Sequence, residues 1–116
     1  MNNNFESIIL ENIREGILLL DKKLNFLFIN QEAEDIIGKS KKFLKKGNNI
    51  SAIDKEIIKL IKEVNKTHKT KFVSEVTITD TLGNKNINSI YLRPIFNYNN
   101  KKQTLEYILI QFANLE

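Results

Sequence analysis

Apolar side chains recur every three or four residues in three segments of the chain, and this spacing predicts helices. The expected helices run from about Asn4 to Ile13, over Gln31–Ile37, and from about Lys55 to Asn65. An asparagine or aspartate precedes each one and can accept hydrogen bonds from the free amides of the first turn. Gly38 is expected to end the second helix, because glycine readily adopts the left-handed conformation found there. The apolar stripes are Phe5, Ile8, Ile9 and Ile13, then Ala33, Ile36 and Ile37, then Ile57, Ile58, Leu60, Ile61 and Val64.

Five other segments have the composition of β-strands. Two of them flank the short turn Lys22–Asn25, where Asp21 can hydrogen-bond the backbone two residues on. Gly16 is expected to take a left-handed conformation that turns the chain out of the first helix. The residues between Lys39 and Ile53 are expected to be irregular, and Asn97–Gln103 to be a polar loop. The five strands are predicted at Gly16–Asp21, Phe26–Asn30, Lys71–Thr81, Asn86–Phe96 and Leu105–Ala113.

Alternation along the strands predicts which side chains share a face of the sheet. The first, second and last strands are apolar on both faces, which indicates that both faces are covered. The third strand is expected to place Phe72, Val76 and Ile78 on one face. In the fourth strand, Ile90, Leu92 and Phe96 alternate with Tyr91, Arg93 and Ile95. The element order predicts an α+β fold: a five-stranded antiparallel sheet with helices on one face and a leading helix.

The stretch Ile13–Ser40 resembles the opening of a PAS domain, the small sensory module of many bacterial signalling proteins. The matching positions are Gly16, Asp21, Asn30, Ala33 and Gly38. The resemblance covers nearly the whole chain, and is nearest to the N-terminal PAS domain of nitrogen-regulation-type sensor histidine kinases. It implies one domain over residues 1–116, with an N-terminal helix within 1–13 and a PAS core over 16–114. It also implies that the first and last strands lie side by side at the centre.

What the resemblance implies about function is a sensory and dimerisation module rather than an enzyme. The expected partners are a second copy, paired through the stripe of the first helix, and an output domain, most simply that of a histidine kinase. A transcription regulator or a diguanylate cyclase remains an alternative parent. Family members often carry Asp-x-Thr after the last strand, whereas Asn114-Leu115-Glu116 stands here, and the final two residues also resemble a cloning scar.

A small ligand would be held between the sheet and the helices in this fold. Arg93 could bind an anion bidentately, or its aliphatic stem could cover the other face of the sheet. The sequence does not name a ligand. The candidate lining residues are Ile36, Ile37, Phe43, Ile57, Leu60, Ile61, Ile90, Leu92 and Arg93.

Gly38-Lys39-Ser40 matches the end of a phosphate-binding loop, so a nucleotide-binding protein is the alternative from a different class. Ala33 stands where that motif needs its first glycine, and Glu34 and Asp35 would repel phosphate. In a true loop these residues open a helix, whereas Gly38 is expected to close one. The helix end is therefore the favoured interpretation.

Redox and metal cofactors find little support in the sequence. There is no cysteine, which excludes a cysteinyl-flavin adduct, and the single histidine, His68, is expected in a polar turn past the long helix. Haem ligation needs a histidine aimed into an apolar pocket, and one histidine without cysteine does not make a structural zinc site. No cofactor and no metal are expected, and the protein should purify colourless.

The charge balance is basic, with 18 Lys and Arg against 14 Asp and Glu and a net charge of +4. Only Arg14 and Arg93 are arginines, whereas nucleic-acid sites favour arginine, so no nucleic-acid partner is expected. Lys39, Lys41, Lys42, Lys45 and Lys46 form a cluster that is either solvated or near a pocket mouth. No apolar run approaches a membrane span and no signal peptide is evident, so a cytoplasmic protein without membrane contact is expected.

Overall fold

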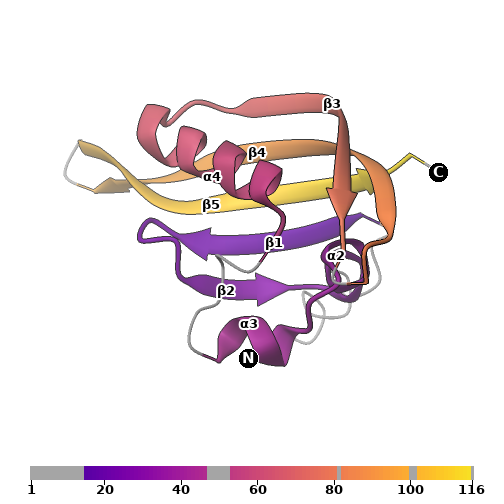
Figure 1. The fold of residues 1–116 in the computed structure, drawn as a ribbon. Coiled ribbons are helices and arrows are strands. Elements are labelled where there is room, and N and C mark those ends of the chain that lie inside the picture. The colour runs from indigo at the N-terminus through magenta and orange to yellow at the C-terminus, as the bar shows by residue number, and fades with distance from the viewer. Residues whose placement is uncertain (1–14, 47–52, 81, 100–101, 116) are drawn as a thin grey trace.

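The structure is a computed structural model that describes residues 15–46, 53–80, 82–99 and 102–115. The predicted first helix and its stripe, Phe5, Ile8, Ile9 and Ile13, lie outside the described residues. So does Gly47 to Ala52 in the basic segment. In chain order (Figure 1) the elements are β1 (Gly16–Asp21), β2 (Phe26–Ile29), α2 (Gln31–Ile37), α3 (Lys41–Lys45), α4 (Lys55–Thr67), β3 (Lys71–Thr79), β4 (Lys85–Asn99) and β5 (Lys102–Asn114).

The strands form one antiparallel sheet in the order β2-β1-β5-β4-β3. The first and last strands pair at the centre, as predicted, with Leu18 opposite Ile110 and Leu20 opposite Ile108. All four of these side chains are fully buried. Leu18 and Leu20 point to the side of the sheet that the helices cover, whereas the alternate residue Leu19 points to the other side and is partly buried.

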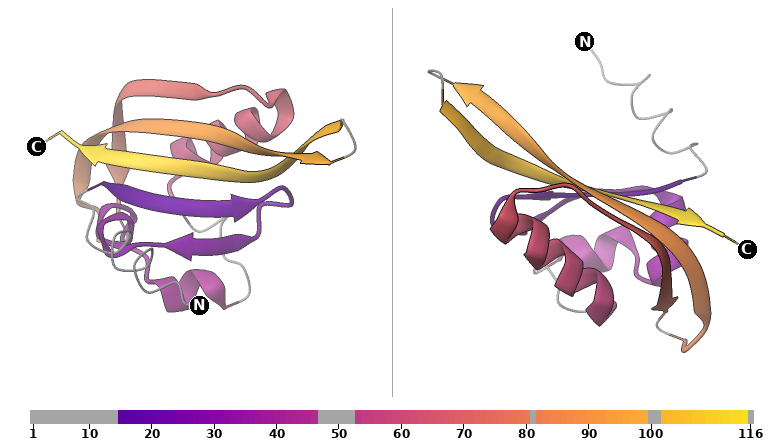
Figure 2. Two further views of the ribbon diagram at one scale, coloured as in Figure 1. Left: turned by 180° about the vertical axis from the view of Figure 1, so that it is seen from behind. Right: turned by 90° about the horizontal axis from the view of Figure 1, so that it is seen from above.

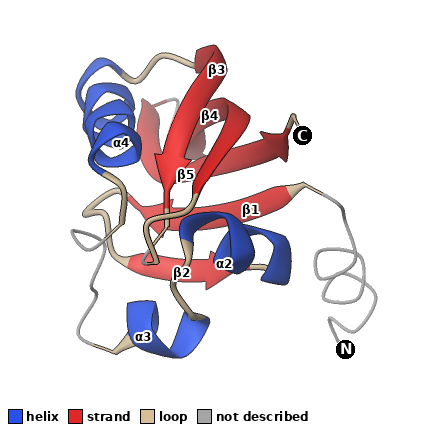
Figure 3. Ribbon diagram, turned by 45° about the vertical axis from the view of Figure 1, so that its right-hand side comes forward, coloured by secondary structure: helices blue, strands red, loops and turns tan. Residues whose placement is uncertain are grey.

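The described helices α2, α3 and α4 all lie on one side of the sheet (Figures 2 and 3), which we call the inner face. A single core fills the space between them. It combines Leu18, Leu20, Ile29 and inward residues of β3, β4 and β5 with the apolar stripes of α2 and α4. The α+β architecture predicted from the sequence is confirmed. The opposite side of the sheet, the outer face, carries no described helix.

The face assignment predicted for β3 is wrong at Phe72. The pairing with β4 shifts between Val73 and Val76, where β3 uses one residue more than its partner. Such a bulge reverses the alternation on one side of it. Val73 therefore packs against the core, while Phe72 is 61% exposed on the outer face with its ring edge-on to Tyr91.

The polar loop predicted between the last two strands is also shorter than expected. β4 continues to Asn99 and β5 begins at Lys102, so the two form a ribbon that extends past the other strands (Figure 1). The ribbon pairs Phe96 with Leu105 and Asn97 with Thr104. The polar composition of this ribbon led to the prediction of a loop, because a two-stranded ribbon has few positions that need to be apolar.

Two local predictions between residues 16 and 46 need correction. Lys41–Lys45 is a short helix rather than irregular chain, and Ser40 Oγ accepts from the Phe43 amide at 3.1 Å as its cap. Gly16 lies within β1 and is not among the residues of positive φ. A glycine is needed at this position because there is no space for a side chain: a Cβ on residue 16 would lie 3.0 Å from the Cα of Ala33.

Several turn predictions are confirmed. Asp21 accepts from the amides of Lys23 and Asn25, both at 2.9 Å. Gly38 ends α2 at φ 74°, and its N–H donates to the Glu34 carbonyl at 2.8 Å. Asp54 caps α4 through the Glu56 amide at 2.8 Å and also accepts from the Thr79 amide at 3.0 Å. Asp54 therefore joins the start of α4 to the end of β3.

Candidate functional site

Asn30 is the buried polar residue of the segment from Glu15 to Gly38, and it does more than cap a helix. Its Oδ1 accepts from the Ala33 amide at 3.0 Å, as a helix cap should, and also from the Ile17 amide at 2.9 Å. Its Nδ2 donates to the Glu15 carbonyl at 2.9 Å. Asn30 is fully buried. One side chain thus fixes the start of β1 and the start of α2 to each other.

The predicted ligand-lining residues divide into two groups. Seven of the nine lie in the single core between sheet and helices, each no more than 9% exposed: Ile36, Ile37, Ile57, Leu60, Ile61, Ile90 and Leu92. Phe43 and Arg93 are exposed and lie outside that core. The seven form the inner wall that the prediction envisaged, and their contact with a ligand stays a prediction.

Arg93 lies on the outer face, because it follows the buried Leu92 in β4. Its guanidinium is 5.4 Å from the ring centre of Tyr91. The two residues line a shallow depression of about 370 Å³ together with Glu15, Gln111 and others. Gln111 Nε2 donates to Glu15 Oε1 at 3.2 Å. Arg93 therefore cannot reach a ligand held between the sheet and the helices, and whether its stem covers the sheet stays a prediction.

One polar side chain of the inner face has no hydrogen-bond partner among the residues that the structure describes. Asn88 in β4 is fully buried, and neither its Oδ1 nor its Nδ2 has a partner. Its cross-strand neighbours are Val76 in β3 and Asn114 in β5. The inward Ile90 follows two residues later. Most buried side-chain polar atoms in proteins are hydrogen-bonded, so a buried asparagine with none needs an explanation.

The phosphate-loop alternative fails on the local geometry of residues 33–40. Gly38 ends one helix and Ser40 starts the next. The amides of Ala33 and Gly38 already donate within the protein, to Asn30 and to Glu34. A phosphate cradle needs several free amides converging on one point. The geometry therefore does not offer the nucleotide site that the motif suggests.

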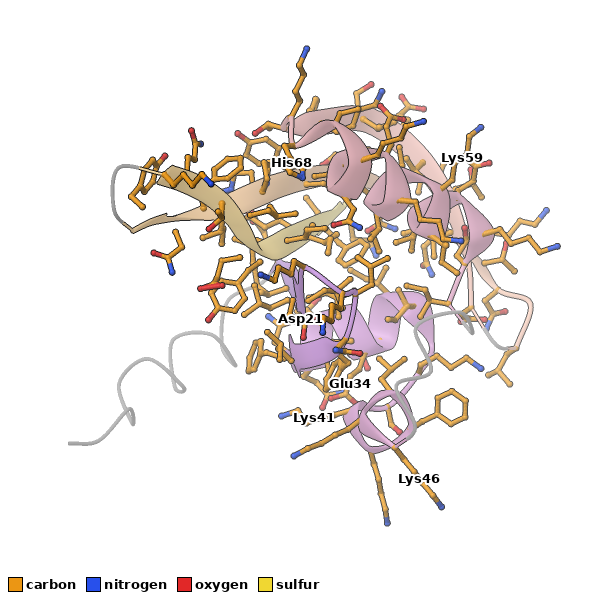
Figure 4. All side chains as sticks on the ribbon, turned by 90° about the vertical axis from the view of Figure 1, so that its left-hand side faces the viewer. Asp21, Glu34, Lys41, Lys46, Lys59 and His68 are labelled. Carbon is orange, nitrogen blue, oxygen red and sulfur yellow. The ribbon has the colours of Figure 1, made fainter. Side chains whose placement is uncertain are left out.

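His68 occupies the turn at which it was predicted. It ends α4 with φ 60°, is exposed, and has its ring edge-on to Phe96 at 6.2 Å between centroids (Figure 4). Asn65 and Leu105 border a depression beside it. The side chain does not point into the main core, which is the position haem ligation would need.

The lysine cluster surrounds α3 and lies on the surface. Lys46 points away from the body of the protein (Figure 4). Lys41 Nζ lies 5.6 Å from the ring centre of Phe28, and Lys39 Nζ lies 4.7 Å from that of Phe43. Exposed cation–aromatic contacts of this kind contribute about 0.5–1 kcal/mol. The cluster packs against α3 and β2, and its arrangement fits a solvated surface.

Comparison with known families and structures identifies the fold. A family model described as "PAS domain" matches residues 3–69 of the chain. The chain belongs to the PAS domain family. No curated protein sequence matches it.

Solved structures similar to this PAS domain come from different kinds of protein. The PAS domain of nitrogen regulation protein NR(II) from Vibrio parahaemolyticus is 19% identical with a TM-score of 0.66, covering 95% of this chain and 97% of that one. A PAS domain from a two-component sensor histidine kinase is 15% identical, TM-score 0.69, covering 96% and 94%. The PAS domain of the fruit-fly ELK potassium channel is 12% identical, TM-score 0.70, covering 99% and 98%. At these identities the likeness establishes the fold.

Asn88 was missed by the sequence analysis of this PAS domain. The alternation of Ile90 and Leu92 could have found it, because stepping back two residues along the strand places Asn88 on the same inward face. What no pattern shows is that Asn88 has no partner. Asn30 and Asn88 are the two buried polar residues in the part of the chain that the structure describes.

Proposed function

We propose that this PAS domain is the sensory and dimerisation module of a bacterial signal-transduction protein, with a sensor histidine kinase as its parent. Two of the similar structures are PAS domains of a nitrogen regulation protein and of a sensor histidine kinase, which supports the proposal. The observation that carries it is the apolar character of the outer face. A face of this kind needs a covering partner, and pairing supplies one.

The outer face presents apolar and aromatic side chains from four strands. Leu19 and Leu109 are partly buried at its centre, while Ile95, Tyr91 and Tyr107 are each 37–38% exposed. Phe72 extends the surface to the edge strand. Contiguous apolar patches of this sort are uncommon on monomers and mark sites of association. A second copy is the occupant we propose, because closed two-fold pairs are the commonest protein assemblies.

The same face brings the two ends of the described core together. Gly16 at the start of β1 pairs with Phe112 near the end of β5. Glu15 is hydrogen-bonded to Gln111 on the outer face. Pressure from a partner on these strands would therefore shift both the preceding and the following chain. That shift is the proposed route by which a change in packing reaches an output domain.

The remaining parts of the proposal concern location and cofactors. None of the helices in the described ranges is long and apolar enough to cross a membrane. We propose a cytoplasmic module that carries neither haem nor a metal and has no nucleic-acid partner. The exposed position of His68 supports the absence of haem.

A charge placed on the outer face tests the pairing. Ile95→Lys should weaken self-association of the intact chain about 100-fold in sedimentation equilibrium, because the new ammonium would be buried without a partner. Leu82→Lys is the matched control, since Leu82 is 84% exposed in the β3–β4 turn. The control should dimerise normally. Circular dichroism checks that both variants fold.

Two results would count against the proposal. One is a monomeric intact chain at concentrations far above micromolar. The other is an Ile95→Lys variant that dimerises as well as the Leu82→Lys control, which would place the interface elsewhere.

A further inference from the structure

Asn88 lies at the end of the inner face where β3, β4 and β5 meet. Val76 and Asn114 are its cross-strand neighbours, and Ile90 and Phe112 form the next pair along the same strands. Helix α2 packs against β1, β3 and β5 over this face. The side chain therefore points into the layer between sheet and helix, and water does not reach it.

The amide of Asn88 carries two N–H donors and an acceptor oxygen with two lone pairs. All of these are unused. A buried polar group gains stability only when it is hydrogen-bonded, and an apolar residue of similar shape would serve the packing better. The position is thus unfavourable for the folded domain alone, and it becomes favourable once a partner supplies the missing bonds.

We infer that Asn88 is the recognition residue for a small uncharged ligand that carries a donor and an acceptor side by side, as amides, lactams and amide-like heterocycles do. Such an edge forms two hydrogen bonds with a carboxamide at once. The inference rests on the sensory function proposed above, and names the chemical class that this function detects.

The charge of the ligand follows from the other polar and charged side chains near the inner face. Asn30, the other buried polar residue of the described part, has its oxygen and its nitrogen engaged by Ile17, Ala33 and Glu15. Arg93 lies on the opposite face. An ionic ligand would be buried beside apolar side chains without a counter-charge, which is strongly unfavourable. A neutral ligand with an apolar body avoids that cost.

Asn88 is fully buried, and it lines none of three depressions on the described surface, which lie on the outer face, beside His68 and beside Asp54. A ligand that reaches Asn88 must therefore separate the helices from this end of the sheet. The ligand-bound and ligand-free packings then differ, and a ligand that binds one of them better shifts the population toward it. Recognition at Asn88 and signalling are linked by that displacement.

Three matched probes test the inference on the intact chain: benzamide, toluene and benzoate. They share an aromatic body, and carry a neutral amide, no polar group and a charge, respectively. Benzamide should bind saturably, in about the millimolar range usual for so small a molecule. It should shift the Asn88 side-chain amide signals in nitrogen-15 NMR spectra. Toluene should bind at least about 10-fold more weakly, and benzoate should not bind.

Variants of Asn88, with a control variant at Asn86, separate ligand recognition by the amide from effects on core packing. Asn88→Leu should abolish benzamide binding, and Asn88→Ala, which does not add volume, should remove the preference for benzamide over toluene. Asn86→Leu, two residues away on the same strand and partly exposed, should bind benzamide as the natural chain does.

The outcomes also separate this inference from the function on which it rests. Equal binding of benzamide and toluene, or undiminished benzamide binding by Asn88→Leu, would overturn the role of Asn88 and leave the sensory module intact. A failure of benzamide to perturb Asn88 up to its solubility limit would overturn the ligand class. A monomeric intact chain, or undiminished pairing of the Ile95→Lys variant, would instead count against the proposed function and leave the ligand result standing.

Discussion

Asn30 and Asn88 are two fully buried asparagines of one small domain in opposite situations. Asn30 lies between β2 and α2, and its side-chain amide makes three hydrogen bonds, two to the backbone at the start of β1 and one to the backbone of α2. Asn88 lies in β4 opposite Val76 of β3 and Asn114, the last residue of β5, and its side chain makes no hydrogen bond within the described part of the chain. The same side chain thus holds two segments together in one place and has unused hydrogen-bonding groups in the other.

The difference shows how a buried polar group reveals its role through its partners. The bonds of Asn30 go to N–H and C=O groups that would otherwise be unsatisfied at the beginning of a strand and of a helix. Its role is structural. The backbone around Asn88 is already paired on both sides by β3 and β5, so nothing in the fold requires its amide. A residue whose polar atoms the fold does not use is a candidate for binding.

Removing the amide of Asn30 should have the largest effect. Asn30→Ala is expected to destabilise the domain by about 3 kcal/mol, because a helix cap is lost and the Ile17 amide and Glu15 carbonyl are left unsatisfied. Urea unfolding measures the change. A loss of about 1 kcal/mol, the value of a simple cap, would mean that the bonds to β1 contribute little.

Asn30→Asp sharpens this result. It retains an acceptor for the Ile17 and Ala33 amides and loses the donor to Glu15. Its stability should lie between those of the natural chain and Asn30→Ala. An Asp variant no more stable than the Ala variant would show that the two accepted bonds are not the important ones.

A substitution at Gly16, which packs closely against Ala33, should produce the second largest loss of stability. Gly16→Ala is expected to cost about 2 kcal/mol, because the added methyl would meet the backbone of Ala33, which the capped helix holds in place. The same urea experiment applies. An unchanged urea midpoint would indicate that α2 can move away from β1 freely. That result would contradict the role of Asn30 in holding β1 and α2 together.

Replacing Asn88 should change stability in the opposite direction. Asn88→Leu is expected to stabilise the ligand-free domain by about 1 kcal/mol, because an unsatisfied amide is exchanged for an apolar side chain in an apolar layer. Asn86→Leu serves as the control and should change the urea midpoint little. A clear loss of stability in Asn88→Leu alone would show that the amide has a structural use after all.

Lowering the pH should produce the smallest change in stability, through protonation of Asp21 in the turn between β1 and β2. Burial raises the pKa of Asp21, but hydrogen bonds from Asn25 and Lys23 outweigh it, so the pKa is lowered overall. A lowered pKa means that Asp21 stabilises the fold above about pH 4, the unfolded value, and loses this contribution as pH falls through the folded value. The stability advantage over Asp21→Asn should shrink over that range in urea melts. An advantage that stays constant down to about pH 2 would contradict the assignment.

Local sequence signals determined much of this protein. The Asn30 cap, the left-handed Gly38, the Asp21 turn and the stripe of α4 all act over a few residues, and each was predicted at the position where it occurs. The order of elements indicated the five-stranded antiparallel sheet, and the resemblance to PAS domains placed the first and last strands at its centre. These features are readable because residues near in sequence dictate them.

Only the tertiary structure decided the features that depend on residues far apart. The bulge at Val73 turned Phe72 outward, and Arg93 separated from the inner residues with which it had been grouped. Gly16 proved necessary because Ala33 packs against it rather than because of its own backbone angles. Asn88 could be placed on a face from alternation, but its lack of a partner depends on every group that β3, β5 and α2 bring around it. A missing hydrogen bond is a property of that assembled environment, and no local pattern encodes it.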